Sequence, residues 1–232
     1  CHFIGGVFLK LSKIKLHNYR CFGDGEQIIL IDDLVAFIGN NSAGKTAALC
    51  ALKCIFSENT NERILKRSDF HLPKDIKPEE LLRQEMYIET VFTFEELESE
   101  DGDKYAVPQF FESLVVDSQD GTPYLRVRLI ATWESSTTLE GAIDSKIVYI
   151  TCSEKQKITD DDIIIAQRRD LDRIRVVYVP AVRDPEKQLK NVSGTMMHQI
   201  MSSINWSEAT IQNVTMKIQE LNAQFMGAKG VA

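Results

Sequence analysis

The chain has few cysteines, and they show none of the spacings that build a disulfide framework or a zinc site. There are five in 232 residues, an odd number, without a C-x-x-C pair or a histidine at zinc-ligand spacing: Cys1, Cys21, Cys50, Cys54 and Cys152. Long apolar runs are also missing, since none reaches the roughly 18 residues needed to cross a bilayer. These absences predict a protein of the reducing cytoplasm, without structural disulfides, structural zinc or contact with a membrane.

Positive charge is also in short supply. Lys and Arg number 27 against 34 Asp and Glu, which gives a net charge of −7. A protein that binds nucleic acid with its whole surface is usually basic, so this class is disfavoured, although a local basic face is compatible with the composition. With 44% apolar and 26% charged residues the chain resembles an ordinary globular protein, and its length suits one large domain or two small ones.

What the sequence does contain is a complete phosphate-loop pattern, G-x-x-x-x-G-K-[S/T]. It is formed by Gly39, Asn40, Asn41, Ser42, Ala43, Gly44, Lys45 and Thr46. The two glycines let backbone N–H groups converge on phosphate oxygens, and Lys45 would reach the β- and γ-phosphates. Thr46 would offer its hydroxyl to Mg²⁺. The pattern predicts a site for ATP and Mg²⁺; the alternative is a glycine-rich turn with an incidental Lys-Thr pair.

The flanks of this loop favour the nucleotide site over the simple turn. Residues 34–38 (LVAFI) are a continuous apolar run, which predicts a strand buried on both faces of a parallel sheet. Residues 46–56 contain good helix formers with apolar side chains at helical spacing, so a helix is expected where the loop ends. A strand, a phosphate loop and a helix in that order predict an α/β P-loop NTPase.

Further strands are predicted from alternating polar and apolar residues. The first, residues 8–16, is expected near a sheet edge because one of its faces is polar. The others are expected at 27–31 and, as an antiparallel meander, at 85–94, 124–133 and 145–152.

Other segments are assigned from local charge and periodicity. Arg126 and Arg128 share one face of the 124–133 strand, and an exposed face is favoured over a nucleic-acid contact because no aromatic stacking pattern accompanies them. A helix capped by Thr159 or Asp160 is expected to run to about residue 172. A buried strand is expected at 175–179 and helices at 196–226.

Three stretches of the chain resemble ABC-type ATPases of the RecF, SMC and OLD (overcoming lysogenization defect) group. Residues 13–22 (KIKLHNYRCF), followed by a phosphate loop with Asn at its third position, are similar to the opening of these proteins. Within the group, residues 63–72 (RILKRSDFHL) and 176–184 (VVYVPAVRD) are most similar to OLD-family ATP-dependent endonucleases. The resemblance implies an ABC-ATPase fold with a mixed sheet, an antiparallel β-subdomain and C-terminal helices.

The resemblance also suggests site residues outside the phosphate loop. Arg20 corresponds to a position that contacts phosphate in this superfamily, although packing of Tyr19 and Phe22 beneath the sheet would explain the same element. ABC-type lobes sense the γ-phosphate through a Gln after a later strand. Arg183 and Asp184 are therefore expected near the nucleotide, with Gln188 as a looser counterpart and a strand-end cap as the alternative.

Two motifs of a complete ABC-type ATPase are missing from the sequence. No apolar strand ends in Asp-Glu, and the piece nearest to an L-S-x-G-[E/Q] signature, residues 192–195 (VSGT), lacks the leading Leu and the acid. Residues 101–103 (DGD) superficially match the D-x-D pair of a Toprim nuclease, but the acidic run before them favours a solvated loop. We therefore expect a partial ATPase domain that binds ATP but hydrolyses it poorly.

These observations predict four segments in one partial domain. They are a P-loop core (1–72), a β-meander subdomain (85–152), a second core segment (159–190) and a helical segment (196–226). The leading functional interpretation is the N-terminal ATP-binding segment of an OLD-family DNA endonuclease. In that family ATP binding would regulate dimerisation and DNA processing, in phage defence or DNA repair.

The expected partners follow from the same resemblance. They are ATP, DNA through the full-length protein, and further copies of the chain in a homodimer or higher oligomer. The alternatives are a RecF- or SMC-like DNA-repair ATPase without a nuclease, and a nucleotide-binding interaction module that hydrolyses nothing.

Overall fold

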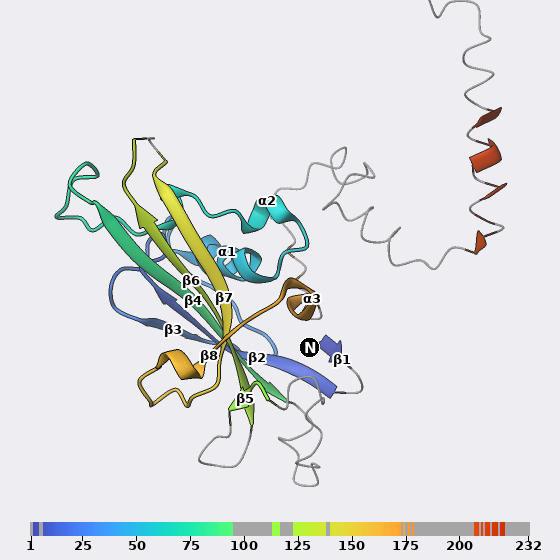
Figure 1. Cartoon of the computed structure of the whole chain (residues 1–232), viewed down its shortest axis with the longest axis horizontal. Coiled ribbons are helices and arrows are strands. Elements are labelled where there is room, and N and C mark those ends of the chain that lie inside the picture. The colour runs from blue at the N-terminus through green and yellow to red at the C-terminus, as the bar shows by residue number, and fades with distance from the viewer. Residues whose placement is uncertain are drawn as a thin grey trace, which may run out of the picture. The chain divides into compact units, whose positions relative to one another are not determined.

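An antiparallel sheet with helices against one face forms the first of two units in the chain, residues 1–178, and residues 179–232 form the second (Figure 1). The computed structural model describes residues 2–4, 7–94, 113–116, 123–137, 140–172, 174, 176 and 178, and part of 207–220. The elements of the first unit are β1 (His2–Ile4), β2 (Val7–His17), β3 (Gln27–Leu30), α1 (Lys45–Phe56), α2 (Thr60–Arg63), η1 (Arg67–Asp69), β4 (Arg83–Phe94), β5 (Val115–Val116), β6 (Tyr124–Glu134), β7 (Ala142–Ile150), η3 (Asp160–Asp162), β8 (Ile163–Ile165) and α3 (Arg168–Leu171).

The sheet has the strand order β1-β2-β4-β6-β7-β8, with β3 paired to β2 and β5 paired to β6. Every strand pair among the described residues is antiparallel. The alternating segments predicted as strands are β2, β3, β4, β6 and β7, so the antiparallel part of the predicted fold is confirmed. The predicted place of β2 near a sheet edge agrees with this order, since only the short strands β1 and β3 lie outside it, while β4 pairs along its other side.

The strand predicted at residues 34–38 is not formed. This segment has no regular secondary structure, and the side chains of Leu34 and Ile38 are 91% and 94% exposed. An apolar run becomes a buried strand only where neighbouring strands accept its hydrogen bonds and other layers cover its faces. No described strand pairs with this run, so its apolar composition alone does not bury it.

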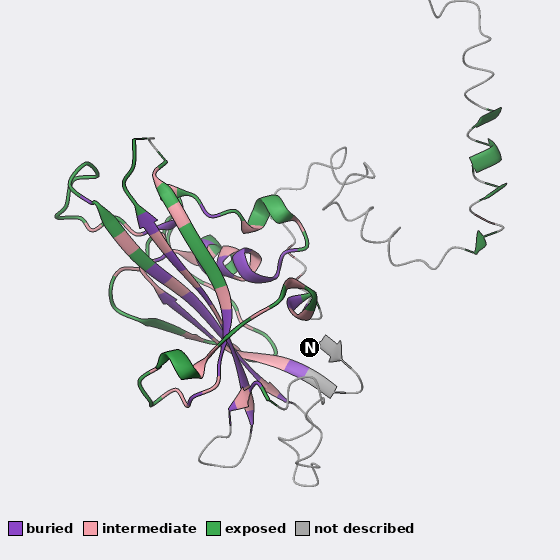
Figure 2. Ribbon diagram, in the orientation of Figure 1, coloured by how far each residue is buried: buried purple, intermediate pink, exposed green. Residues whose placement is uncertain are grey.

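Helix α1 packs on one face of the sheet and builds the main core. Three of its apolar side chains, Ala51, Ile55 and Phe56, are at most 1% exposed and belong to one cluster with Leu16 of β2 and Ile88 of β4. Figure 2 shows buried stretches on both the helix and the strands of the sheet. Burying each large apolar side chain stabilises the fold by about 1.5–3 kcal/mol. The helix that follows the phosphate loop, predicted from the sequence at 46–56, is thus confirmed and fixed against the sheet.

The opposite face of the sheet carries a buried ion cluster, which we call the Glu89 cluster and define as Lys15, Glu89, Arg126 and Arg128. Lys15 and Arg128 are the register partners of Glu89 on the two neighbouring strands. The Glu89 carboxylate accepts hydrogen bonds from Arg126 Nε (3.0 Å) and Nη2 (3.2 Å) and from Arg128 Nε (2.5 Å), and Lys15 Nζ lies 3.6 Å away. Glu89 is 0% exposed and Arg126 2% exposed.

The exposed arginine face predicted for this strand is therefore wrong. Arg126 Nη1 also donates to the carbonyl oxygen of Cys152 at 2.6 Å, because the chain after β7 returns over this face. Val148, Ile150 and Cys152 form a small second core on the same side of the sheet. A buried arginine is tolerated here because its charge is paired and its donors are used.

Glu154 forms the rim of the same ionic region. It accepts from Lys13 Nζ at 2.7 Å and lies 2.6 Å from Lys15 Nζ. Burial alone would raise the pKa of Glu154, but the hydrogen bonds and charges of Lys13 and Lys15 outweigh it and lower that pKa below its ordinary value. Glu154 therefore stays ionised and balances two of the cations on this face.

The helix predicted over 159–172 is also wrong. Residues 160–162 form the short 3-10 helix η3, the three consecutive isoleucines form strand β8 against β7, and only Arg168–Leu171 is α-helical. β-branched residues favour strands, and an open sheet edge on β7 is available for pairing. Thr159 occupies the N-cap position of η3, and its amide and hydroxyl both donate to the carboxylate of Asp162.

Two arginines hold the C-terminal end of α1. Arg168 of α3 donates from Nη1 to Ile55 O at 2.8 Å and from Nη2 to Ser57 O at 3.0 Å. Arg63 Nη1 donates to Ser57 O at 2.6 Å. Guanidinium groups satisfy carbonyls that a helix end leaves without partners and suit the negative end of its dipole.

In the second unit the described residues from Glu208 to Glu220 are helical, within the predicted helical segment 196–226. The Ser207 hydroxyl accepts from the amide of Thr210 at 3.2 Å, which is the geometry of a helix N-cap. Among the described residues no helix combines the length and apolar character needed to span a bilayer.

Candidate nucleotide-binding site

The phosphate-loop residues form a turn that leads directly into α1. Gly44 is the N-cap, with φ 89° and ψ 0°, and the first helical bond runs from the amide of Ala48 to Gly44 O at 2.9 Å. Among the described residues no acceptor contacts the amides of Lys45, Thr46 and Ala47 in the first turn. Unpaired N–H groups at the positive end of a twelve-residue helix are suited to bind an anion.

Gly44 is required by both its backbone and its surroundings. A left-handed φ of 89° is unfavourable for any residue with a Cβ. A Cβ at this position would also lie 2.8 Å from Cys21 Sγ and 2.9 Å from Phe22 Cζ. The Asn-Tyr-Arg-Cys-Phe element therefore packs directly against the turn into α1, a contact between segments more than twenty residues apart that local pattern does not reveal.

Lys45 lies over its own loop. Its ammonium donates to the carbonyl oxygens of Gly39 and Asn40, both at 2.6 Å. Both contacts are exposed, so the ammonium can exchange a carbonyl for a phosphate oxygen at little cost in solvation.

The side chains on the loop face a pocket of about 350 Å³. It is lined by Arg20, Cys21 and residues 41–47. Arg20 and Lys45 supply two positive charges to this pocket, together with the free amides of the helix N-terminus. Gly39 and Asn40 contribute to the loop through their carbonyls rather than to the lining.

Arg20 is held in place by the segment around η1. Its amide donates to Asp69 O at 2.8 Å, and its Nε donates to Asp69 Oδ1 at 2.9 Å. Burial alone would lower the pKa of Arg20, but Tyr19 and Asp69 raise it above its ordinary value. The guanidinium is therefore charged at any physiological pH. The sequence identified Arg20 as a candidate but left the role of Asp69 open.

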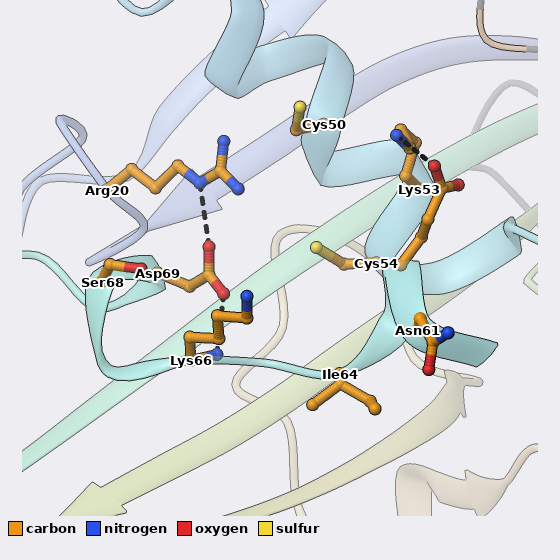
Figure 3. Close-up of a pocket in the computed structure, with 10 residues that line it drawn as sticks. Arg20, Cys50, Lys53, Cys54, Asn61, Ile64, Lys66, Ser68 and Asp69 are labelled. Atoms are coloured by element: carbon orange, nitrogen blue, oxygen red, sulfur yellow. Dashed lines mark hydrogen bonds and ion pairs between the residues drawn. The ribbon is translucent and has the colours of Figure 1, made fainter. Parts of the chain in front are cut away.

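A second pocket of about 310 Å³ shares Arg20 and lies beside α1 (Figure 3). Its other walls include Lys66, Ser68 and Asp69 from the η1 region and Cys50 and Lys53 from the helix. Lys53 pairs with Glu62 at 2.6 Å. Arg20 thus lines both pockets.

Several residues considered from the sequence lie outside the described residues. These are Arg183, Asp184 and Gln188, together with the Asp101 and Asp103 pair. Thr46, the predicted magnesium ligand, is exposed and lines the pocket. Within the described residues no group of three His, Cys, Asp or Glu side chains could hold a metal ion.

Comparison with known proteins identifies the family. A family model described as an AAA ATPase domain matches residues 9–226. The chain belongs to the AAA ATPase domain family. This confirms the predicted α/β P-loop ATPase class, and the match includes the phosphate loop, the described sheet from Leu9 of β2 to β8 and the helical part of the second unit.

Comparisons of this AAA ATPase domain with solved structures and with curated proteins give less information. A solved structure described as "Structural biochemistry of ATP-driven dimerization and DNA stimulated activation of SMC ATPases" matches with a TM-score of 0.42 and 11% identity. The match covers 90% of this chain and 98% of that chain. No curated protein sequence matches the chain.

Proposed function

We propose that this AAA ATPase domain binds ATP, with the phosphates on the loop of residues 39–46. The observation that carries the proposal is the pocket itself, which gathers the unpaired amides of the α1 N-terminus, the Lys45 ammonium and the Arg20 guanidinium around one cavity. Such an arrangement suits a polyanion, because hydrogen bonds to charged groups are about twice as strong as neutral ones. The AAA ATPase family supports ATP as that polyanion.

Each group has a distinct role in this proposal. The amides of residues 45–47 hold the phosphate at the helix dipole, Lys45 moves from the loop carbonyls to the terminal phosphates, and Arg20 adds a second cation to the pocket. Thr46 would offer its hydroxyl to Mg²⁺, whose remaining ligands would be phosphate oxygens and water. The ion would neutralise charge on the phosphates. We also propose Arg183 as a further contact to the nucleotide.

We propose binding rather than rapid turnover as the activity of this chain. The sequence has no apolar strand ending in Asp-Glu and no L-S-x-G-[E/Q] signature, the groups that polarise water and complete the site across a dimer in ABC-type ATPases. The expected result is stoichiometric ATP binding with little phosphate release. Fast phosphate release, on the order of 1 s⁻¹ or more, would contradict this proposal.

Cys21 offers a direct test of where the nucleotide binds. Its thiol is exposed and lines the pocket, whereas burial raises the pKa of Cys54 to about 11 and keeps that thiol protonated. In a chain with Cys1 and Cys50 changed to Ser, Mg-ATP should slow maleimide labelling of Cys21. In the same background Lys45→Ala should remove the protection. Labelling of Cys21 that ATP does not slow would place the nucleotide elsewhere or exclude its binding.

The finer proposal is an OLD-family role, in which ATP binding regulates dimerisation and DNA processing in the full-length protein. It is supported by the stretches 13–22, 63–72 and 176–184. Light scattering of the chain with and without ATP tests the dimer. Nuclease activity of the full-length gene product, with a Toprim Glu and D-x-D in its remaining sequence, tests the OLD assignment. An ATP-dependent dimer without nuclease would favour the RecF- or SMC-like alternative.

A further inference from the structure

We infer that Asp69 is a positioning residue that holds the Arg20 guanidinium toward the phosphates of the nucleotide. This inference rests on the proposed function, because it assigns a task to Arg20 within the same site. Asp69 itself does not line the phosphate-loop pocket. It therefore acts through Arg20 rather than through contact with the ligand.

The two segments that carry this pair are docked by their backbones. Tyr19 and Phe70 form an antiparallel bridge. The amide of Arg20 donates to Asp69 O, and the amide of His71 donates to Asn18 O, each at 2.8 Å. The position of Arg20 is therefore fixed by a segment 49 residues later in the chain, and its φ of 51° is maintained by these bonds.

The Asp69 carboxylate is held independently of Arg20. Its Oδ2 accepts from the amide of Lys66 at 2.8 Å, which closes the η1 turn, while Oδ1 accepts from Arg20 Nε at 2.9 Å. Asp69 is 6% exposed. One oxygen thus anchors the carboxylate to its own turn and leaves the other to orient the guanidinium.

Arg20 keeps its two terminal nitrogens for another partner. The bond to Asp69 uses Nε, and no hydrogen bond within the described residues uses Nη1 or Nη2. Figure 3 shows Nε facing the Asp69 carboxylate. A guanidinium held at Nε presents two parallel N–H donors, which is the geometry that matches two oxygens of one phosphate group.

A purely structural role for Asp69 makes a different prediction from a positioning role. If Asp69 only closes the η1 turn, its loss weakens ATP binding whether or not Arg20 is present. If it acts through Arg20, its loss has no further effect once Arg20 has been removed. A double-mutant cycle separates the two, because it measures the coupling between the two side chains.

The experiment measures the dissociation constant of Mg-ATP by calorimetry for wild type, Arg20→Ala, Asp69→Asn and the double variant. Asn keeps the shape of Asp but has one acceptor oxygen, so it cannot serve both Lys66 and Arg20. Each single variant should weaken ATP binding about tenfold, and the double variant should bind like Arg20→Ala. A loss of about a hundredfold in the double variant, the product of the single effects, would overturn the inference.

Arg83 and Glu85 supply a matched control on the sheet. They form an exposed Arg–carboxylate pair at 2.7 Å that lines neither pocket. Arg83→Ala and Glu85→Gln should leave ATP affinity unchanged, and circular dichroism should show that all variants are folded. ATP binding that is insensitive to Asp69→Asn would overturn this inference alone. Absence of ATP binding by the wild-type chain would overturn the proposed function itself.

Discussion

The Glu89 cluster and the phosphate-loop pocket are two basic regions on the same protein with opposite arrangements. In the Glu89 cluster, Arg126 and Arg128 direct their donors at a carboxylate that is 0% exposed. In the pocket, the hydrogen bonds of Lys45 within the described part of the chain go to exposed loop carbonyls, and Arg20 uses a single nitrogen on its carboxylate partner. The difference shows that the number of cations in a region says little about ligand binding. What matters is how many of their donors the fold itself uses.

The largest effect is expected when the carboxylate at the centre of the Glu89 cluster is removed. Glu89→Ala would leave three cations facing one another in a buried site, and such a loss typically costs about 3–5 kcal/mol of stability. Urea-induced unfolding measures it. Glu85→Ala on the same strand is the control, since its pair with Arg83 is exposed and contributes less than about 1 kcal/mol. A Glu89→Ala variant as stable as the control would show that the cluster does not hold the sheet.

In the phosphate-loop pocket, removing a cation should alter ATP binding rather than stability. Lys45→Ala should weaken ATP binding by about a hundredfold or more, because it removes a charged donor from the phosphates. The free energy of unfolding should change by no more than about 0.5 kcal/mol, since the hydrogen bonds of the Lys45 ammonium are exposed. Calorimetry and urea unfolding of the same preparation measure both. A variant that loses stability but keeps its ATP affinity would reverse the contrast between the two regions.

Gly44 tests whether the shape of the loop matters as much as its charge. Gly44→Ala should destabilise the fold by about 1–3 kcal/mol, because a Cβ would clash with Cys21 and Phe22 at a left-handed φ. It should also weaken ATP binding without changing any charge. Gly23→Ala is the matched control, since the nearest atom to its Cβ would be His71 Nε2 at an ordinary 3.4 Å. Equal thermal shifts in the two variants would disprove the packing argument.

The smallest effect is expected at the rim of the Glu89 cluster. The pKa of Glu154 is lowered below 4.5 in the folded state, so its contribution to stability is present above pH 4.5 and is lost as the pH falls through the lowered value. Glu154→Gln should therefore cost less than about 1 kcal/mol at neutral pH and almost nothing in acid. Unfolding curves at neutral pH and below pH 4.5 measure this. If the loss of stability in Glu154→Gln became larger as the pH falls, the result would contradict this prediction.

The sequence predicted elements whose signals are local. The phosphate loop has four fixed positions, and helix α1 and strands β4, β6 and β7 follow from periodicity over nine to twelve residues. The segment at 163–165 was mispredicted because three isoleucines fit a strand or a helix face equally well, and the free edge of β7 decides between them.

Features that depend on distant partners could not be predicted in this way. The burial of Arg126 depends on Glu89, 37 residues earlier, and on a carbonyl 26 residues later. The fixation of Arg20 depends on Asp69, 49 residues later. The apolar run at 34–38 lacks a partner strand in the described sheet, so its composition misled the prediction. In each case the structure of one segment depends on which distant segment it contacts, and the local sequence does not identify that segment.

Helix α1 is anchored at both ends, and this has a consequence for ligand affinity. Cys21 and Phe22 pack against the N-cap residue Gly44, and the guanidinium groups of Arg63 and Arg168 donate hydrogen bonds to carbonyl oxygens at the C-terminal end of the helix. Contacts at both ends fix the position and orientation of α1 before an anion binds. The anion-binding amides are therefore preorganised, and the entropy cost of ordering them falls on folding rather than on association.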